Sequence, residues 1–588
     1  LNPGWTRVRA VINKKHGRKT LMKRLLCALL TIALLISCLP AALAEGNQEA
    51  TLSILATRHV EGSFTDINDL WWFKYLKHYL AGEGWDVTFE LEQTLEPEER
   101  ISLLLATDDL PDVLWGGTLM TNVNQVIYGA GEGMLMDWTP YFNAETMPNA
   151  YGKLAEYAGV FTLPNGAIYS MPRLSGRVYY TSLGSYPTPR CFVNTKWLEQ
   201  CNLEMPTTLD GFIDMLRAFK GVTSENGETW PVCSIANFIE DVIWNALGFY
   251  GSNEGASASW DGTDFAIRDG KLELPCYTEQ YKEFLKYMNI LYSEGLIHPD
   301  HFTLDEITKR GMMSEGLCGV FCDWTMALSQ TTDAYADYVF YSPLSSDSCE
   351  KPVGSLGVVV SSSGISASAK TKYPELIAKI VDYMYTDMGS MLYNNGPMQG
   401  TEECLGVVDG WYLDEQGNFC TKKVDDGEIE GFDVYRMAYI YPAQAAPIDL
   451  SAADRTAKKL AGYDSKEEIK QVTDAVTGTV MDVPVNNPYN TPSADAQWRV
   501  TSTNAWIDNV TAVSLPAVFL SEEENTRVTD LATAIETYVS AETTKFIIGT
   551  RSMDEVDAFF EKLRALGVEE YCEIYRNAYS SYLNSIFG

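Results

Sequence analysis

The stretch Thr51-Leu-Ser-Ile-Leu-Ala56 is a short apolar run of strand length, and the residues that follow it decide the fold class. Apolar side chains recur at helical spacing over residues 66–81, with an aspartate in position to cap the helix and glycines behind it. Residues 85–91 alternate as a second strand, Pro97 begins another helix, and Asp112–Trp115 is a third strand. This order predicts a parallel sheet with right-handed crossovers.

Similar patterns continue to the end of the chain. Capping residues followed by apolar stripes predict helices, and short apolar runs rich in β-branched and aromatic residues predict buried strands. The helices are expected from Leu209, over 281–292 and 374–388, and after the capping boxes Ser521-x-x-Glu524 and Ser552-x-x-Glu555; the strands are expected at Leu317–Cys322 and Leu356–Val360. The chain therefore reads as an α/β protein with about 3–4 domain lengths or two large lobes.

The composition excludes several classes of protein. Hydrophobic residues make up 46% of the 588 residues, which is enough for a core and rules out general disorder. Twelve cysteines are too sparse for a small disulfide scaffold. The formal net charge is −35, although residues 1–44 carry eight basic side chains and no acidic one. Because so acidic a body repels phosphate backbones and anionic lipids, we expect no nucleic-acid partner.

A secretory signal peptide is predicted at residues 22–44. Met22-Lys23-Arg24 precedes an apolar run from Leu25 to Ile36 that is too short to span a bilayer. Residues 1–21 are polar and basic, and we expect them to be an upstream artefact of the sequence. No later apolar run is long enough for a transmembrane segment, so the mature chain is expected to have none.

Two processing sites stay open. Ala42-Leu43-Ala44 fits an ordinary signal peptidase, whereas Leu35-Ile36-Ser37-Cys38 resembles a bacterial lipobox in which Cys38 would be lipidated. Either route predicts an extracytoplasmic protein, secreted or held at the cell surface as a lipoprotein.

The cysteine and histidine spacings predict no metal site. Ten cysteines remain after the signal peptide without regular spacing, so their disulfide state stays open. Cys318-x-x-x-Cys322 lies in an apolar stretch and is interpreted as strand core. His298-x-x-His301 has ligand-like spacing but no third ligand nearby, and we interpret it as a loop pair.

Several stretches occur in the order typical of one family. They are Asp109-Leu-Pro-Asp-Val-Leu-Trp115, Gly133-Met-Leu-Met-Asp-Trp-Thr139, Gly166-Ala-Ile-Tyr-Ser-Met-Pro172, Val193-Asn-Thr-Lys-Trp-Leu198 with Pro206-Thr-Thr-Leu-Asp210, and Leu291-Tyr-Ser-Glu-Gly-Leu-Ile297. On these motifs the chain resembles the extracellular solute-binding proteins (family 1) of carbohydrate ABC transporters, in their large Gram-positive branch, over roughly residues 50–585.

The resemblance implies a two-lobed α/β fold of the periplasmic-binding-protein type II class. Each lobe would hold a mixed sheet flanked by helices, with extra helices at the C-terminus. Lobe 1 would take residues 46–171 with 363–400, and lobe 2 would take 172–362 with 401–588. The implied partners are a carbohydrate ligand and the membrane permease subunits of an ABC importer, with no cofactor, and the protein would be a monomer.

One feature of the branch is missing from this sequence. Many of its members carry a calcium loop, and the matching place here is Ser224–Trp230. It retains Asn226-Gly227 but lacks the ordered carboxylates that a hard cation needs, so we predict no calcium site.

Candidate ligand contacts follow from the expected position of a ligand beyond the carboxyl ends of the strands. Aromatic rings stack on the apolar faces of sugars, and charged or amide side chains bond their hydroxyl groups. The candidates are Arg58, Glu61, Trp115, Tyr179, Asn237, Phe238, Trp244, Asp323 and Trp324. Trp115 and Trp324 would come from different lobes and sandwich a sugar ring, but core packing stays open for Trp115, Trp244 and Trp324.

Three functions remain open at this point. The ordered motifs favour a non-catalytic binder that captures an oligosaccharide in a cleft between the lobes and delivers it to a permease. The alternatives are a secreted glycoside hydrolase, which needs two carboxylates about 5–10 Å apart, and a ligand-sensing surface module. Suitable acidic pairs occur by chance among 79 acidic residues, and no G-x-S-x-G or H-E-x-x-H motif is present. The sequence identifies neither the sugar nor the permease.

Overall fold

The computed structural model describes most of the chain after the predicted signal peptide. The described residues are 47–58, 66–174, 191–236, 238–251, 258–323, 337–356, 360–413, 419–421, 435–442, 469–473, 480–484, 507–513 and 518–587. They form two compact units: a small one within 1–50 and 77–88, and a large one of 51–76 and 89–588. In the small unit the Gln48 amide donates to the Gly84 carbonyl at 2.9 Å. No helix within the described ranges is long and apolar enough to cross a membrane.

The first sheet has five strands in the order β2-β1-β3-β12-β4. Their bounds are β1 Gln48–Thr57, β2 Trp85–Thr94, β3 Val113–Trp115, β4 Met171–Leu174 and β12 Val360–Ala367. Strands β1 and β3 are parallel, as the strand–helix–strand pattern predicts, whereas β12 runs antiparallel to β3 and β4. The sheet is therefore mixed.

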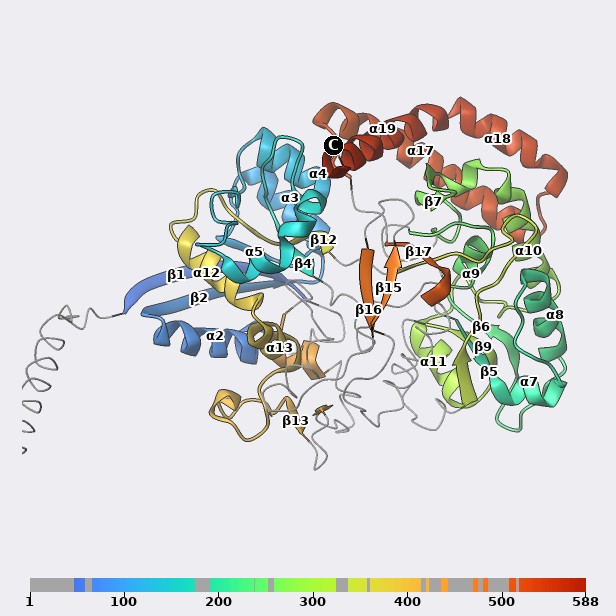
Figure 1. Cartoon of the computed structure of the whole chain (residues 1–588), viewed down its shortest axis with the longest axis horizontal. Coiled ribbons are helices and arrows are strands. Elements are labelled where there is room, and N and C mark those ends of the chain that lie inside the picture. Colours follow the sequence, from blue (N-terminus) through green and yellow to red (C-terminus); the bar gives the residue numbers. More distant parts are fainter. Residues whose placement is uncertain are drawn as a thin grey trace, which may run out of the picture. The chain divides into compact units, whose positions relative to one another are not determined.

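Helices flank this sheet (Figure 1). They include α2 Trp71–Gly82, α3 Pro97–Thr107, α5 Pro148–Leu154, α12 Pro374–Met384 and α13 Asp387–Asn395. The prediction of a single helix over 374–388 is wrong, because the helix is interrupted between α12 and α13. Thr386 is extended there and caps α13 by accepting from the Gly389 amide at 2.8 Å.

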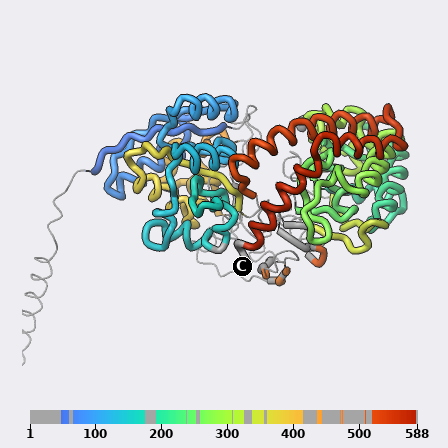
Figure 2. Tube along the Cα trace, turned by 90° about the horizontal axis from the view of Figure 1, so that it is seen from above, coloured from blue at the N-terminus to red at the C-terminus, as the bar shows by residue number. Residues whose placement is uncertain are grey.

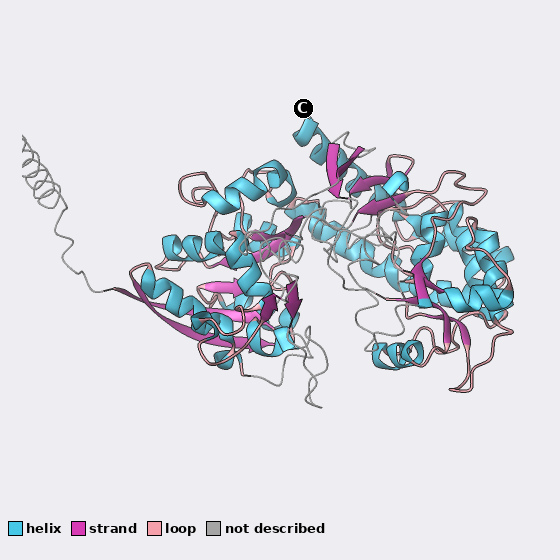
Figure 3. Ribbon diagram, turned by 60° about the horizontal axis from the view of Figure 1, so that its bottom comes forward, coloured by secondary structure: helices cyan, strands magenta, loops and turns pink. Residues whose placement is uncertain are grey.

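The second sheet has four strands in the order β10-β5-β9-β6. The bounds are β5 Cys191–Asn194, β6 Trp230–Cys233, β9 Cys318–Cys322 and β10 Tyr338–Phe340. Strand β9 lies at the centre, parallel to β6 and antiparallel to β5, and all five of its residues are buried. This confirms the prediction of a buried strand at residues 317–322. Figure 3 distinguishes the helices, in cyan, from the strands, in magenta.

The core beside this second sheet is built on helices α8 Leu209–Phe219, α9 Ile239–Ala246 and α10 Gln280–Ser293. Thr208 caps α8 by accepting from the Gly211 backbone amide, and the helix expected from Leu209 is confirmed. The apolar stripe predicted over 281–292 is buried at Tyr281, Phe284 and Leu291.

Three C-terminal helices extend the same core: α17 Glu522–Ile547, α18 Val556–Ala565 and α19 Val568–Phe587, the red segment in Figure 2. The capping box Ser521–Glu524 is confirmed. The second predicted box is wrong, because Ser552 accepts from the Asp554 amide and begins a short 3₁₀ turn before α18.

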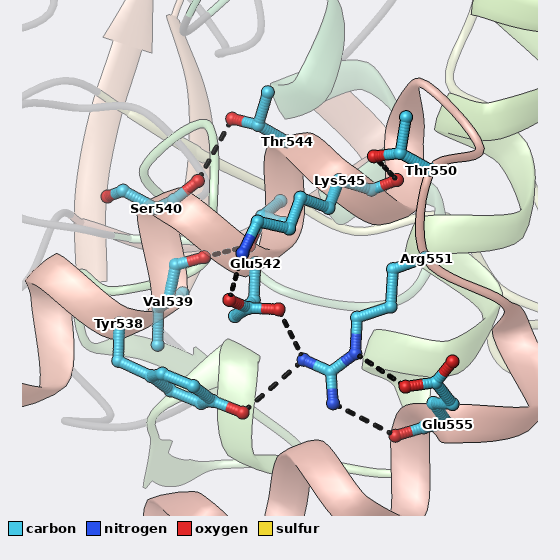
Figure 4. A network of polar contacts seen from close by, with 10 residues as sticks. Tyr538, Val539, Ser540, Glu542, Thr544, Lys545, Thr550, Arg551 and Glu555 are labelled. Carbon is cyan, nitrogen blue, oxygen red and sulfur yellow. Dashed lines mark hydrogen bonds and ion pairs between the residues drawn. The ribbon is translucent and has the colours of Figure 1, made fainter.

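A polar network fixes the turn between α17 and α18 (Figure 4). The Arg551 guanidinium donates to Glu542 Oε2 at 2.7 Å and to the Tyr538 hydroxyl at 3.3 Å, and pairs with the Glu555 carboxylate at 3.5 Å. Because the Arg551 side chain is only 13% exposed, this network is screened less by salt than a surface pair.

Residues after position 400 contact elements of the first sheet's lobe. The Trp71 indole of α2 donates to the Glu403 carbonyl at 2.7 Å, and Arg436 donates to the Asn394 carbonyl of α13 at 3.4 Å. The division of the chain into 46–171 with 363–400 and 172–362 with 401–588 stays a prediction, and these contacts favour a boundary later than residue 400.

Candidate ligand-binding site

The parallel strands β1 and β3 end at one edge of the first sheet, where Ala56 is opposite Trp115. Arg58 follows β1 and is only 5% exposed. Its guanidinium donates to the Gln93 side chain at 3.4 Å and to the Met437 carbonyl at 3.3 Å. Burial lowers the pKa of Arg58 to about 10, with Asp66 opposing the shift, so the side chain stays charged at neutral pH.

Trp115 lies at this same edge but is only 1% exposed. Its indole nitrogen donates to the Tyr393 hydroxyl at 2.9 Å, and the Phe73 ring meets it edge-on at 5.7 Å. The structure therefore places Trp115 at the end of β3, inside an aromatic cluster. Its contact with a ligand stays a prediction.

Gly116 allows β1 and β3 to approach closely where they end. Its φ is +146°, and a Cβ added there would collide with the Thr57 side chain, whereas a Cβ on Gly117 would meet its nearest atom, the Ser363 carbonyl oxygen, at 3.5 Å.

We expect Gly116→Ala to lower the free energy of unfolding by about 1–3 kcal/mol through strain and the clash. Chemical denaturation would measure the loss, with Gly117→Ala as the matched control. Equal effects of the two substitutions would contradict this assignment.

In the second sheet the parallel strands β6 and β9 also end together, and Asp323 follows β9. The Asp323 side chain is 0% exposed and pairs with two cations of helix α11 (Glu306–Ser314). Lys309 Nζ lies 3.0 Å from Asp323 Oδ2, and Arg310 Nε lies 3.0 Å from the same oxygen. Two cations thus hold one buried carboxylate at the strand end.

Lys309 brings two of the predicted residues together. Its ammonium lies 3.0 Å from the Asp323 carboxylate and 4.8 Å from the centre of the Phe238 ring, and it donates to the Cys322 carbonyl at 3.0 Å. Sequence reasoning missed Lys309 and Arg310, because adjacent basic residues on a short helix give no signal of burial.

Trp244 packs as a core residue. It is 0% exposed, its ring stacks on Phe284 with the centroids 3.9 Å apart, and its indole nitrogen donates to the Ser259 carbonyl at 3.1 Å. Of the interpretations open for Trp244, the structure supports core packing and does not place it beside Phe238 and Asp323.

The remaining candidates lie outside the described residues. These are Glu61, Tyr179, Asn237, Trp324 and the lipidation site Cys38. The pairing of Trp115 with Trp324 around a sugar therefore stays a prediction.

The two histidines of the 298–301 turn have different surroundings. The His301 ring is buried, with Nε2 2.7 Å from Glu240 Oε1 and Nδ1 3.0 Å from the Ser234 carbonyl. His298 meets the Trp230 ring edge-on at 4.7 Å. Among the described residues no group of three or more His, Cys, Asp or Glu side chains could hold a metal ion. At the place of the missing calcium loop, the side-chain amide of Asn226 donates to the Glu315 carbonyl at 2.9 Å.

The His301–Glu240 pair predicts a pH dependence of stability. Burial opposes protonation of the ring, but the charge and hydrogen bond of Glu240 outweigh it, so the pKa of His301 is raised. A raised folded-state pKa contributes stability below the unfolded-state value, and this stability is lost as the pH rises through the folded-state value.

We therefore expect the free energy of unfolding to fall on alkalinisation from pH 6, by about 1 kcal/mol for each unit by which the pKa is raised. Denaturation at a series of pH values would show a shallower fall in His301→Asn. An unchanged slope in that variant would refute the assignment.

Comparisons with known proteins extend beyond these local features. No family model matches the chain. The fructooligosaccharide ABC transporter substrate-binding protein FusA of Streptococcus pneumoniae serotype 4 is 23% identical over 512 residues, which cover 82% of each protein. Lipoprotein LipO of Bacillus subtilis is 24% identical over 253 residues, 42% of this chain and 46% of LipO.

Solved structures show the same architecture. An EF-hand mutant of FusA in complex with fructo-nystose superposes with a TM-score of 0.66 at 20% identity, covering 91% of this chain and all of that one. An HMO-binding ABC-transporter-associated solute-binding protein of Bifidobacterium longum infantis gives 0.67 at 18% identity, covering 92% and all of that chain.

The chain therefore has the two-lobed α/β fold of solute-binding proteins, as predicted. It is homologous to FusA, and the resemblance seen in the ordered motifs is confirmed.

Proposed function

We propose that this protein binds an oligosaccharide outside the cytoplasm and delivers it to the permease of an ABC importer. The observation that carries the proposal is the similarity to FusA over 82% of both chains, together with the shared fold. Ligand binding would work by population shift, because a ligand that contacts both lobes stabilises the conformation in which they close on it.

The strand ends supply the chemistry that a sugar needs. Arg58 follows β1 and carries N–H donors, and the end of β3 carries the aromatic pair Trp115 and Tyr393. At the end of β6 and β9, Asp323 and Lys309 lie beside the Phe238 ring. We propose these residues as contacts or as supports of the contacts, together with Glu61, Tyr179, Asn237 and Trp324.

We further propose that the protein does not turn its ligand over. The relatives that support this are transport proteins named for binding, not for catalysis. The alternative of a glycoside hydrolase requires a pair of carboxylates at one sugar ring. The carboxylate at the second strand end, Asp323, is buried and paired with Lys309 and Arg310, so its oxygens are already engaged with cations of this chain.

A thermal-shift panel tests the proposal. The full chain would be screened against fructooligosaccharides, milk oligosaccharides and pectin-derived fragments. These are the ligand classes after which FusA, the Bifidobacterium protein and a polygalacturonan/rhamnogalacturonan-binding relative are named. We expect a rise in melting temperature that grows with the concentration of one class, unchanged by EDTA. A melting temperature insensitive to every class would overturn the proposal.

The place of action is proposed separately. We propose that the chain is exported, with either a lipid-modified Cys38 or a new N-terminus at Glu45, and acts as a monomer beside its permease. N-terminal mass analysis of the native protein distinguishes the two routes, and an intact Met22 on cytosolic protein would contradict both.

A further inference from the structure

Strand β9 carries two cysteines: one is bonded to a cysteine of β6, and the other lies opposite a cysteine of β5. Cys318 forms a disulfide with Cys233 of β6, with 5.7 Å between their Cα atoms. Cys322, at the other end of β9, is directly opposite Cys191 of β5 in the antiparallel ladder. Two cysteine pairs therefore flank one strand on its two sides.

The Cys191–Cys322 pair has the geometry that a disulfide needs. Directly opposite residues of antiparallel strands have Cα atoms about 4.5 or 5.5 Å apart, and disulfides span about 4.4–6.8 Å. The two thiols are near enough to share a hydrogen bond, and both residues are 0% exposed. The ladder thus places two free thiols side by side.

We propose that Cys191 and Cys322 form a second disulfide, which links β5 to β9 in the exported protein. This modification goes beyond the proposed sugar binding. The oxidant is a disulfide, either of a thiol–disulfide oxidoreductase or of a small thiol. One cysteine thiolate attacks it and releases the first oxidant thiolate; the second cysteine thiolate attacks the mixed disulfide and releases the other. Two protein thiols lose their hydrogens, and the oxidant gains two electrons and two protons.

The disulfide forms while the protein folds and not after the sheet is complete. Burial raises the pKa of the Cys191 thiol well above its ordinary value, and Cys322 beside it adds to the shift. Because the thiolate is the reacting form, the buried pair is nearly inert once the sheet has formed. The bond therefore forms before the strands are covered, and it then resists reductants that do not unfold the protein.

The second disulfide would fasten the strand end that carries the candidate site. The Cys322 carbonyl accepts from Lys309, and the next residue is Asp323. A covalent link between β5 and β9 at this position would hold that end of the sheet in register.

The test is disulfide mapping of the exported full-length protein. Cells are quenched with N-ethylmaleimide before lysis, and the reagent stays present while the protein is denatured without reductant, so that buried thiols are alkylated as well. The protein is then digested and analysed by mass spectrometry. We expect one linked peptide pair joining Cys191 to Cys322 and another joining Cys233 to Cys318. Cys201, whose thiol donates to the Ala218 carbonyl, is the control and should be alkylated. An alkylated Cys191 and Cys322 in the quenched protein would overturn the proposal.

A second measurement separates the new bond from the other disulfide. Thermal melting temperatures are compared with and without dithiothreitol, for wild type and for the Cys191→Ala/Cys322→Ala variant. We expect the reductant to lower the wild-type melting temperature by at least about 3 °C more than that of the variant. Equal reductant effects in the two proteins would contradict the proposal. The stability lost to the cavities that the alanines open does not affect this result, because each protein is compared with itself with and without reductant.

Discussion

A Lys309→Met variant is expected to lose about 3–5 kcal/mol of unfolding free energy. Lys309 and Asp323 are both 0% exposed and lie 3.0 Å apart. Removing the ammonium therefore leaves the buried Asp323 carboxylate with one cation fewer to offset its charge. The loss also removes the ammonium from beside the Phe238 ring. Urea denaturation measures the effect.

Two companion variants sharpen this test. Lys196→Met breaks an ion pair with Asp337 in which the lysine is 70% exposed, and we expect less than about 0.5 kcal/mol there. The double variant Lys309→Met/Asp323→Asn removes both charges and should recover part of the loss. If Lys309→Met were as mild as Lys196→Met, the pair would not be buried and charged as described.

Trp244→Ala is expected to cost about 3–5 kcal/mol of stability and to leave the ligand affinity of the folded protein unchanged. The indole is 0% exposed and stacks on Phe284, so its removal opens a cavity at the centre of the core. Trp244→Phe keeps a stacking ring and should cost clearly less. Denaturation and ligand titration are measured on the same preparations.

The opposite pattern would restore the binding interpretation of Trp244. Were stability little changed and affinity reduced by about 1–3 kcal/mol, the value typical of a lost stacking platform, Trp244 would be a ligand contact.

The sheet strands could be predicted because their apolar residues are stable only in the interior of the protein. Residues 54–56, 113–115 and 318–322 are apolar and buried on both faces, and such runs are buried wherever they pair. The break between α12 and α13 could not be predicted from periodicity, because apolar residues continue across it and a tertiary context fixes the cap at Thr386.

The site was harder to predict than the fold. Strand ends at residues 58, 115 and 323 followed from the general position of ligands in α/β sheets. The burial of a tryptophan depends on rings that are distant in sequence. Phe284 packs against Trp244, and Tyr393 accepts a hydrogen bond from Trp115. The burial of Lys309 depends on Asp323 fourteen residues later, and no spacing rule connects them.

The central claim is that this protein holds an oligosaccharide without changing it. Isothermal titration calorimetry with the oligosaccharide found by the thermal-shift panel tests it most directly, followed by chromatography of the ligand recovered after prolonged incubation. We predict saturable binding of one ligand per chain and complete recovery of the intact oligosaccharide. Shortened products that accumulate with time, or heats that never saturate, would contradict it.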